Sequence, residues 1–266
     1  MLRVLRQKRW IGFSLFTIFM LVLFVRLGLW QFGKLKVRRA SNAVIIANQA
    51  AKPAGYQDIV DAIGPGRKIG AGLEWRTVEV TGRWDYAHQV LLRNRTYNSV
   101  DGYEVITPLE PASGPALLVN RGWIAQGASS VAPAAPAVPQ QGIVTTTVWL
   151  RQSQPPHSSS SLPPGQVLAI DATAIGIAVP YPLVDGYAIL AKEVPTPPST
   201  TMPTLLPGVT IDDGPYLSYG IQWFLFTGVA VVGWWTFIRK EADESTDDDG
   251  VIRDRSTELP DSVRMG

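Results

Sequence analysis

The stretch that decides the fold is Gly214-Pro215-Tyr216-Leu217-Ser218-Tyr219-Gly220-Ile221-Gln222-Trp223-Phe224-Leu225-Phe226. It opens an apolar run that continues to Ile238 and is closed by Arg239 and Lys240. A run of this length with almost no charge is typical of a membrane-spanning helix that ends at a basic headgroup boundary. The sequence therefore predicts a transmembrane helix over residues 214–238.

Four polar or aromatic side chains recur at steps of three and four within this stretch: Tyr216, Tyr219, Gln222 and Trp223. This spacing predicts that they line one side of the first two turns, at headgroup depth. Tyr and Trp at such a boundary also serve as simple membrane anchors. Gln222 favours a contact surface, because an amide near the hydrocarbon needs a hydrogen-bond partner.

A second apolar run lies near the N-terminus, after a basic flank and Trp10. No small-residue cleavage site follows this run. It instead continues through Arg26, Trp30 and Gln31, so an uncleaved transmembrane helix is predicted over residues 11–32. Two interpretations of Arg26 stay open: its side chain reaches the interface, or it faces an acidic partner.

Two spans place both termini on one side of a membrane and residues 33–213 on the other. Arg239 and Lys240 mark the end of the second span as cytoplasmic, so residues 1–10 and 239–266 are expected inside and the middle domain outside. The acidic segment 239–266 lacks apolar periodicity and is expected to be disordered.

The composition excludes several classes of function. The net charge is only +2, so a nucleic-acid partner is not expected. With no cysteine and only two histidines, disulfides, thiolate chemistry and a metal site built within the chain are not expected either. His88 and His157 are interpreted as surface residues of a turn and a loop, and the sequence shows no catalytic motif, so an enzyme is not expected.

The middle domain begins with a helical pattern over residues 40–63 that has Ser41 as a candidate N-cap and is interrupted at Pro53 and Gly55, which predicts two short helices. Short strand-like runs follow at residues 75–81, 89–94, 103–109, 116–124, 143–151, 166–169 and 187–193. Asp171 is a candidate cap of a brief helix. Residues 127–141, 152–165 and 195–207 are expected to be loops. The fold class is therefore a membrane α+β protein, in which two terminal transmembrane helices flank a mainly antiparallel β domain that forms a sheet or a barrel.

One strand-like segment carries a candidate binding group. Strand alternation places Arg121 and Trp123 on one face and Asn120 on the other, while Gly122 permits close approach of another backbone. Arg121 could bind a carboxylate or a propionate through two parallel hydrogen bonds, and Trp123 could stack on a flat ring. A structural ion pair and a core tryptophan explain the same residues equally well.

Five motifs in this order resemble the surfeit locus protein 1 family. They are Leu27-Gly28-Leu29-Trp30-Gln31, Val80-Thr81-Gly82-Arg83-Trp84, Gly102-Tyr103-Glu104-Val105-Ile106-Thr107-Pro108-Leu109, Leu118-Val119-Asn120-Arg121-Gly122-Trp123-Ile124, and residues 214–224. Their order and spacing match the family over most of residues 10–240.

The resemblance implies a non-enzymatic protein of the bacterial plasma membrane, with a periplasmic middle domain, that assists assembly of haem-copper cytochrome c oxidase. Its expected partners are the lipid bilayer, the catalytic subunit of the oxidase and other oxidase subunits, around the insertion of haem a. The residues expected near a transiently bound haem a are Tyr216, Tyr219, Trp223 and Arg121, and those expected to contact the partner are Arg26, Trp30, Gln31, Trp123 and Gln222. Tyr216 stands where family members commonly carry histidine, so axial ligation of iron by this chain is not expected. A permanent accessory structural subunit of the oxidase or of a respiratory supercomplex, and a haem a carrier, are the alternative functions.

Overall fold

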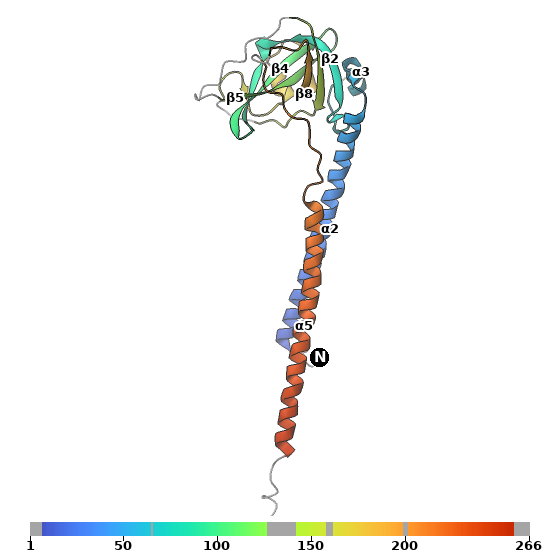
Figure 1. Cartoon of the computed structure of the whole chain (residues 1–266), viewed down its shortest axis with the longest axis vertical. Helices are drawn as coiled ribbons and strands as arrows, with labels where there is room; N and C mark the ends of the chain where they lie inside the picture. The colour runs from blue at the N-terminus through green and yellow to red at the C-terminus, as the bar shows by residue number, and fades with distance from the viewer. Residues whose placement is uncertain (1–6, 65, 127–141, 158–161, 199–201, 258–266) are drawn as a thin grey trace, which may run out of the picture. The chain divides into compact units, whose positions relative to one another are not determined.

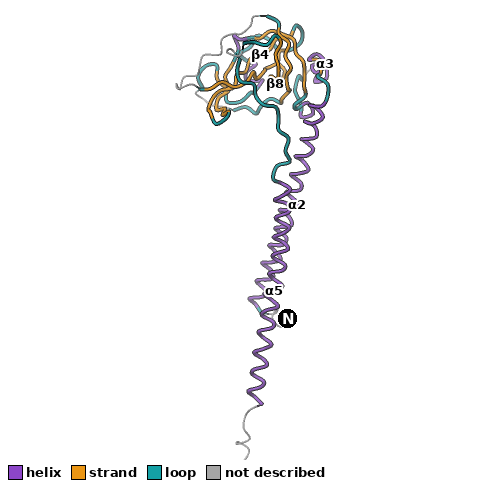
Figure 2. The backbone as a smooth tube through the Cα atoms, in the orientation of Figure 1, coloured by secondary structure: helices purple, strands orange, loops and turns teal. Residues whose placement is uncertain are grey.

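The computed structural model describes residues 7–64, 66–126, 142–157, 162–198 and 202–257, with side chains described as far as residue 244. The chain divides into two compact units. One comprises the residues up to 40 together with those from 212 onward, and the other comprises residues 41–211. Long helices make up the first unit, and strands dominate the second (Figures 1 and 2).

Two long helices, α2 (Lys8–Ala50) and α5 (Tyr216–Thr257), each contain a stretch long and apolar enough to cross a membrane. The helix does not end after residue 32 and Ser41 is not an N-cap as expected, because α2 runs without a break to Ala50; the membrane boundary at residue 32 stays a prediction. No proline occurs between residues 8 and 50, so nothing in the sequence forces an end there. The predicted interruption at Pro53 is confirmed, since the next helix, α3 (Tyr56–Ile63), begins only after it.

Helix α5 also passes its predicted end at Ile238. The structure has helix through Thr257, so the expected disorder of the acidic segment is wrong for residues 241–257. Residues 258–266 lie outside the described chain. Lys240 pairs with Glu244 one turn later at 3.9 Å, a spacing that supports helix in a polar segment.

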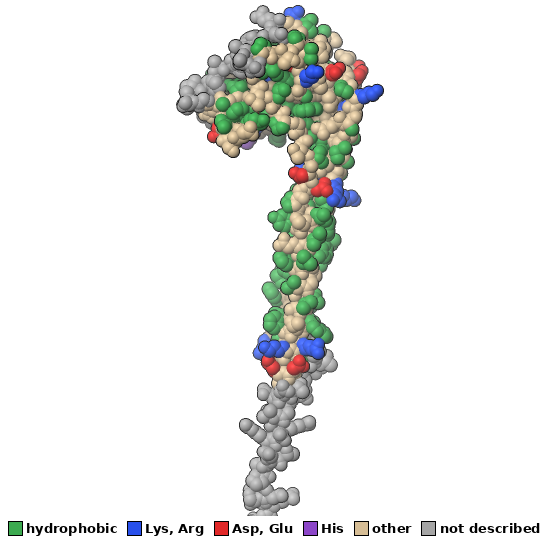
Figure 3. Space-filling model, in the orientation of Figure 1, with side chains coloured by type: hydrophobic (Ala, Val, Ile, Leu, Met, Phe, Trp, Pro, Cys, Tyr) green, Lys and Arg blue, Asp and Glu red, His purple; other side chains and the backbone are tan. Residues whose placement is uncertain are grey.

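The first unit is an antiparallel helix pair. Phe24, Gly28 and Phe32 of α2, spaced four residues apart, all contact α5 at the seam between the two helices, as residues on one face of a helix do. Trp234 Nε1 donates to Ser14 Oγ at 3.0 Å near one end of the seam, and Gly220 accommodates the ring of Phe32 toward the other. Figure 3 shows apolar side chains along this pair with charged groups near both ends.

Ion pairs bracket the apolar part of the helix pair. Arg9 pairs with Glu241 at one end, and at the other Arg39 Nε lies 2.8 Å from Asp213 Oδ2, beside Arg38. A rise of 1.5 Å per residue separates Arg9 and Arg38 by about 44 Å, close to the thickness of a bilayer with its headgroups. The first unit is thus compatible with a membrane protein.

The second unit is built on one sheet with the strand order β1-β2-β6-β8-β5-β4-β3-β7 and an additional β2–β4 pairing. That extra pairing joins β2, β6, β8, β5 and β4 into a closed ring. Five pairings are antiparallel, whereas β1–β2, β3–β7 and β5–β8 are parallel. The strands are β1 (Ala54–Gly55), β2 (Thr77–Trp84), β3 (Val90–Tyr97), β4 (Val100–Pro111), β5 (Ala116–Ala125), β6 (Val144–Arg151), β7 (Gln166–Val167) and β8 (Leu183–Val194).

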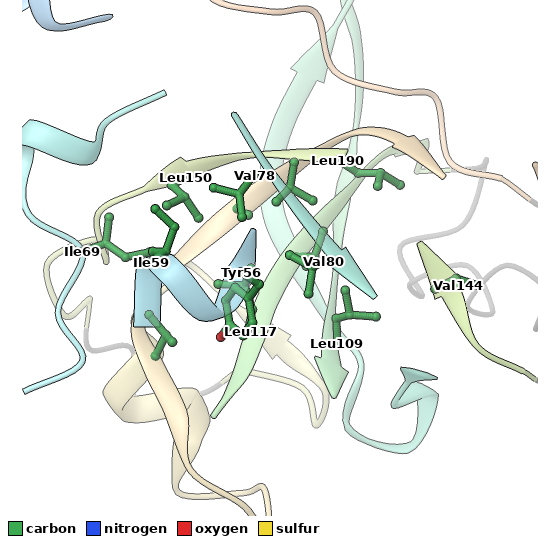
Figure 4. Close-up of a cluster of buried hydrophobic side chains, with 14 of the residues drawn as sticks. Tyr56, Ile59, Ile69, Val78, Val80, Leu109, Leu117, Val144, Leu150 and Leu190 are labelled. Carbon is green, nitrogen blue, oxygen red and sulfur yellow. The ribbon is translucent and has the colours of Figure 1, made fainter. Parts of the chain in front are cut away.

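The ring encloses the main core of this unit. Its apolar side chains come from all five ring strands and from α3, as Figure 4 shows for Tyr56, Ile59, Val80, Leu117 and Leu190. A second cluster, which includes Leu118 and Ile106, lies on the opposite face of β4 and β5 and is covered by α4 (Ala172–Gly176). Interiors of such narrow rings are filled by side chains rather than by ligands.

The sequence predicts these elements closely. Every strand-like run corresponds to an observed strand, with ends that differ by a few residues, and β2 shows the expected alternation of buried and exposed side chains. Asp171 caps α4 by accepting from the backbone N–H groups of Thr173 and Ala174. The loop expected at residues 127–141 lies outside the described residues, as do parts of the loops expected at 152–165 and 195–207.

Candidate functional site

The four residues of the predicted stripe on α5 differ in their burial. Trp223 lies in the seam and stacks on Phe24, with ring centroids 5.6 Å apart, and Tyr216 is half-buried beside Gly214. Tyr219 is about half exposed and Gln222 is exposed. At 100° per residue the four side chains lie within an arc of about 120°, with Trp223 at the border with α2, and their role as a contact surface stays a prediction.

The residues expected at the end of the first span lie near the surface of the helix pair. Trp30 is exposed, with the ammonium of Lys34 5.6 Å from its ring centroid, and Gln31 is half-buried. A tryptophan and a lysine in this arrangement are typical of a membrane interface. Trp30 and Gln31 therefore mark one end of the apolar stretch, and their contact with a partner stays a prediction.

Arg26 points away from α5. Phe24 and Gly28, which flank it by two residues on either side, both contact α5, through Trp223 and Phe224. At 100° per residue, Arg26 faces the opposite direction, and its side chain is exposed. Among the described residues, none forms a hydrogen bond or an ion pair with Arg26. The helix pair thus presents a guanidinium on its outer face, within the apolar stretch.

In the β domain, Arg121 is buried rather than displayed. Only 1% of the residue is exposed, and its guanidinium carbon lies 4.9 Å from the ring centroid of Trp84 and 5.3 Å from that of Tyr86. Its Nη2 is 4.0 Å from Oε2 of Glu193, whose Oε1 accepts from Trp84 Nε1 at 2.9 Å. The guanidinium of Arg121 is therefore not exposed at the surface, where it could bind the carboxylate of a ligand. Its contact with haem a stays a prediction.

The predicted pairing of Arg121 with Trp123 on one face is wrong. Trp123 lies opposite Glu104, while Asn120 lies opposite Ile106, so β5 carries a bulge at Arg121 and Gly122. The extra residue reverses the alternation and puts Trp123 on the same face as Asn120. The close approach expected at Gly122 is present, since a Cβ there would lie 2.3 Å from the carbonyl oxygen of Thr204.

Trp123 belongs to a small polar network that sequence reasoning missed. Its Nε1 donates to the carbonyl oxygen of Arg95 at 2.9 Å, and its ring centroid lies 5.6 Å from that of Tyr97. Beside it, Asn120 Nδ2 donates to Glu104 Oε2 at 2.6 Å. Burial raises the pKa of Glu104, although the nearby charge of Arg95 and the bond from Asn120 oppose that rise.

The two histidines were expected to be surface residues of a turn and a loop. His157 is exposed and His88 is half-buried, and both line one cavity of about 590 Å³. His88 follows Asp85 by three residues in the short helix η2 (Tyr86–His88), and its Nδ1 lies 2.5 Å from Asp85 Oδ2. The Asp85-to-His88 spacing was the sequence signal for this contact. Nothing in the sequence joins either residue to His157. Among the described residues, no three His, Cys, Asp or Glu side chains form a group that could hold a metal ion.

Two helices long and apolar enough to cross a membrane, together with a domain built on a closed ring of strands, define the class of protein. The chain belongs to the SURF1 family, whose model matches residues 18–228, and this family is known in general for cytochrome oxidase assembly factors. The chain is 29% identical over 241 residues to uncharacterised SURF1-like proteins of Mycobacterium bovis and Mycobacterium tuberculosis, a match that covers 87% of this chain and 84% of each relative. It is 21% identical over 213 residues to a SURF1-like protein of Rickettsia felis, covering 79% of this chain and 90% of that protein.

Proposed function

We propose that this chain assists the assembly of haem-copper cytochrome c oxidase by docking its helix pair against the catalytic subunit within the membrane. Membership of the SURF1 family supports oxidase assembly in general. The observation that supports docking is the outward-facing guanidinium of Arg26. A cation at this position favours a carboxylate on a neighbouring helix, because charged groups in spans pair with one another.

Escape of Arg26 to the nearer interface is disfavoured by the direction of its side chain. Side chains of a helix tilt toward its N-terminus, so Arg26 points toward Trp10 and away from the closer end at Trp30. A second copy of this chain supplies no carboxylate at this depth, since residues 8–40 and 214–240 contain no Asp or Glu. The partner is therefore a different membrane protein with an acidic side chain in a span.

The proposed location is the bacterial plasma membrane, with both termini in the cytoplasm and the β domain on the periplasmic side. Arg239 and Lys240 after the second apolar stretch support this orientation. Arg9 and Glu241 lie at the same end of the helix pair, which agrees with termini on one side.

In this proposal haem a is cargo of the assembly and not a resident cofactor. The described residues of the helix pair include no histidine, and Tyr216 is half-buried next to the seam. The pair therefore suits aromatic and hydrogen-bond contact with a flat ring through Tyr219 and Gln222, without ligation of the iron. Trp223 is engaged by Phe24 and would contribute from within the seam. We propose that the chain carries out no catalytic reaction of its own.

The test is deletion of the chain followed by complementation. We expect membranes that lack it to lose haem a absorbance and oxidase activity, and the complete chain to restore both. Unchanged haem a absorbance and unchanged activity after deletion would reject the proposal.

The complemented strain distinguishes an assembly factor from a permanent subunit of the oxidase. Oxidase purified in its active, haem-loaded form should contain this chain at much less than one copy per enzyme. One copy per active enzyme would instead identify an accessory subunit. A Soret band in the chain purified from cells that make haem a would favour the carrier alternative.

A further inference from the structure

One cavity of the β domain is lined by both histidines of the chain. Its volume is about 590 Å³, and its walls are mostly apolar, with Val90 and Val167 on one side and Ala174 and Ile175 of α4 on another. Cavities of this size and character commonly bind small apolar molecules through a few polar groups. None of the contacts proposed for oxidase docking involves this cavity.

His88 is held in a defined orientation at the wall of this cavity. Its Nδ1 lies 2.5 Å from Asp85 Oδ2, which also accepts a hydrogen bond from the hydroxyl of Tyr181. Burial would raise the pKa of Asp85, but the bonds from Tyr181 and His88 outweigh burial and lower it. The Asp85 carboxylate accepts the proton carried by Nδ1, and in this tautomer Nε2 of His88 is a hydrogen-bond acceptor.

A second acceptor lies at the same cavity. Gln166 pairs in the sheet with Leu91, and Leu91 lies three residues after His88. The side-chain oxygen of Gln166 is buried and has no hydrogen-bond donor among the described residues. Nε2 of His88 forms no hydrogen bond among the described residues, and the side chain is 32% exposed. The oxygen of Gln166 is closed off from solvent, so the acceptor that a ligand in this cavity reaches is Nε2 of His88.

We propose that this cavity binds an apolar small molecule that carries a hydroxyl group, with the apolar body against Val90, Val167 and Ile175. The hydroxyl donates to Nε2 of His88 and lies within the part of the cavity lined by Gln166. A bare metal ion does not suit the cavity, because no three ligating side chains gather among the described residues.

The test uses the two histidines as reporters in the full chain held in lipid nanodiscs. Histidine-selective ¹⁵N labelling gives signals from only two residues, and His88→Gln assigns them. We expect 1-naphthol to shift the Nε2 signal of His88 in a saturable manner. The probe 1-methoxynaphthalene, which has the same ring system without the donor, should shift it much less at equal concentration.

Matched variants on α4 separate binding in the cavity from general partitioning into lipid. Ala174 lines the cavity and Thr173 does not, so Ala174→Trp should weaken the effect of 1-naphthol at least tenfold and Thr173→Trp should leave it unchanged. Equal shifts from both probes, or no saturable shift, would overturn the proposal. Each variant must first retain the unliganded histidine signals of the parent chain, which shows that it folds. None of these outcomes depends on oxidase assembly.

Discussion

Arg121 is a buried positive charge, and one residue, Glu193, supplies the negative charge that compensates it. Glu193 is 3% exposed and supplies the negative charge nearest to the guanidinium, while Trp84 and Tyr86 cover it with their rings. Nε and Nη2 of Arg121 have no hydrogen-bond acceptor among the described residues, so the rings and Glu193 carry the compensation. The sequence predicted the structural ion pair as one of two interpretations, and the structure contains it.

Replacing Glu193 with glutamine should therefore destabilise the β domain strongly. The amide keeps an oxygen for the indole of Trp84 but leaves the charge of Arg121 uncompensated, at a cost of about 3–5 kcal/mol. Thermal unfolding of the full chain in detergent, followed by tryptophan fluorescence, measures this change. Glu79→Gln, on the exposed face of β2, is the control and should have little effect. Equal stability of the two variants would contradict the role assigned to Glu193.

The bulge in β5 could not be predicted from the periodicity of the sequence. Alternation predicted the strand, its ends and the close approach at Gly122, because these depend on local residue type. The reversal of faces depends on two residues of β5 lying opposite one residue of β4, which only the pairing determines. The same limit explains α2, since a pattern of apolar and basic residues does not show where a helix without proline will end. It also explains the cavity, whose two histidines lie far apart in the sequence.

Gly122→Ala should destabilise the second unit through this bulge. Gly122 has a φ of 129°, and its added Cβ would collide with the carbonyl of Thr204, so the backbone of the bulge must shift. Strain of this kind costs of the order of 1–3 kcal/mol. Gly72→Ala is the matched control, because a Cβ there meets no atom within 4 Å. Chemical denaturation of both variants checks the prediction, which fails if Gly72→Ala is the more damaging change.

In the whole molecule, each of the two units carries its own candidate functional groups, which can be tested separately. The first presents Arg26 on an otherwise apolar helix face, and the second holds a cavity with His88 and a buried charge at Arg121. Family membership makes oxidase assembly the function to measure, but it does not assign that function to either unit. Substitutions confined to one unit, with stability measured beside assembly, make that assignment.

Arg26→Leu should impair oxidase assembly while leaving the β domain intact. Leucine keeps the helix and its apolar surface, so only the proposed attraction to an acidic side chain in the partner is lost. We expect haem a absorbance and the amount of oxidase that copurifies with the chain to fall several-fold, with the unfolding temperature of the β domain unchanged. Lys36→Leu removes an exposed cation near the end of the apolar stretch and is the control. Arg26→Lys should retain part of the function, because it preserves the charge but not the planar donor group. Full assembly with Arg26→Leu would show that the outward guanidinium binds no carboxylate, and docking would then have to rest on Tyr219 and Gln222.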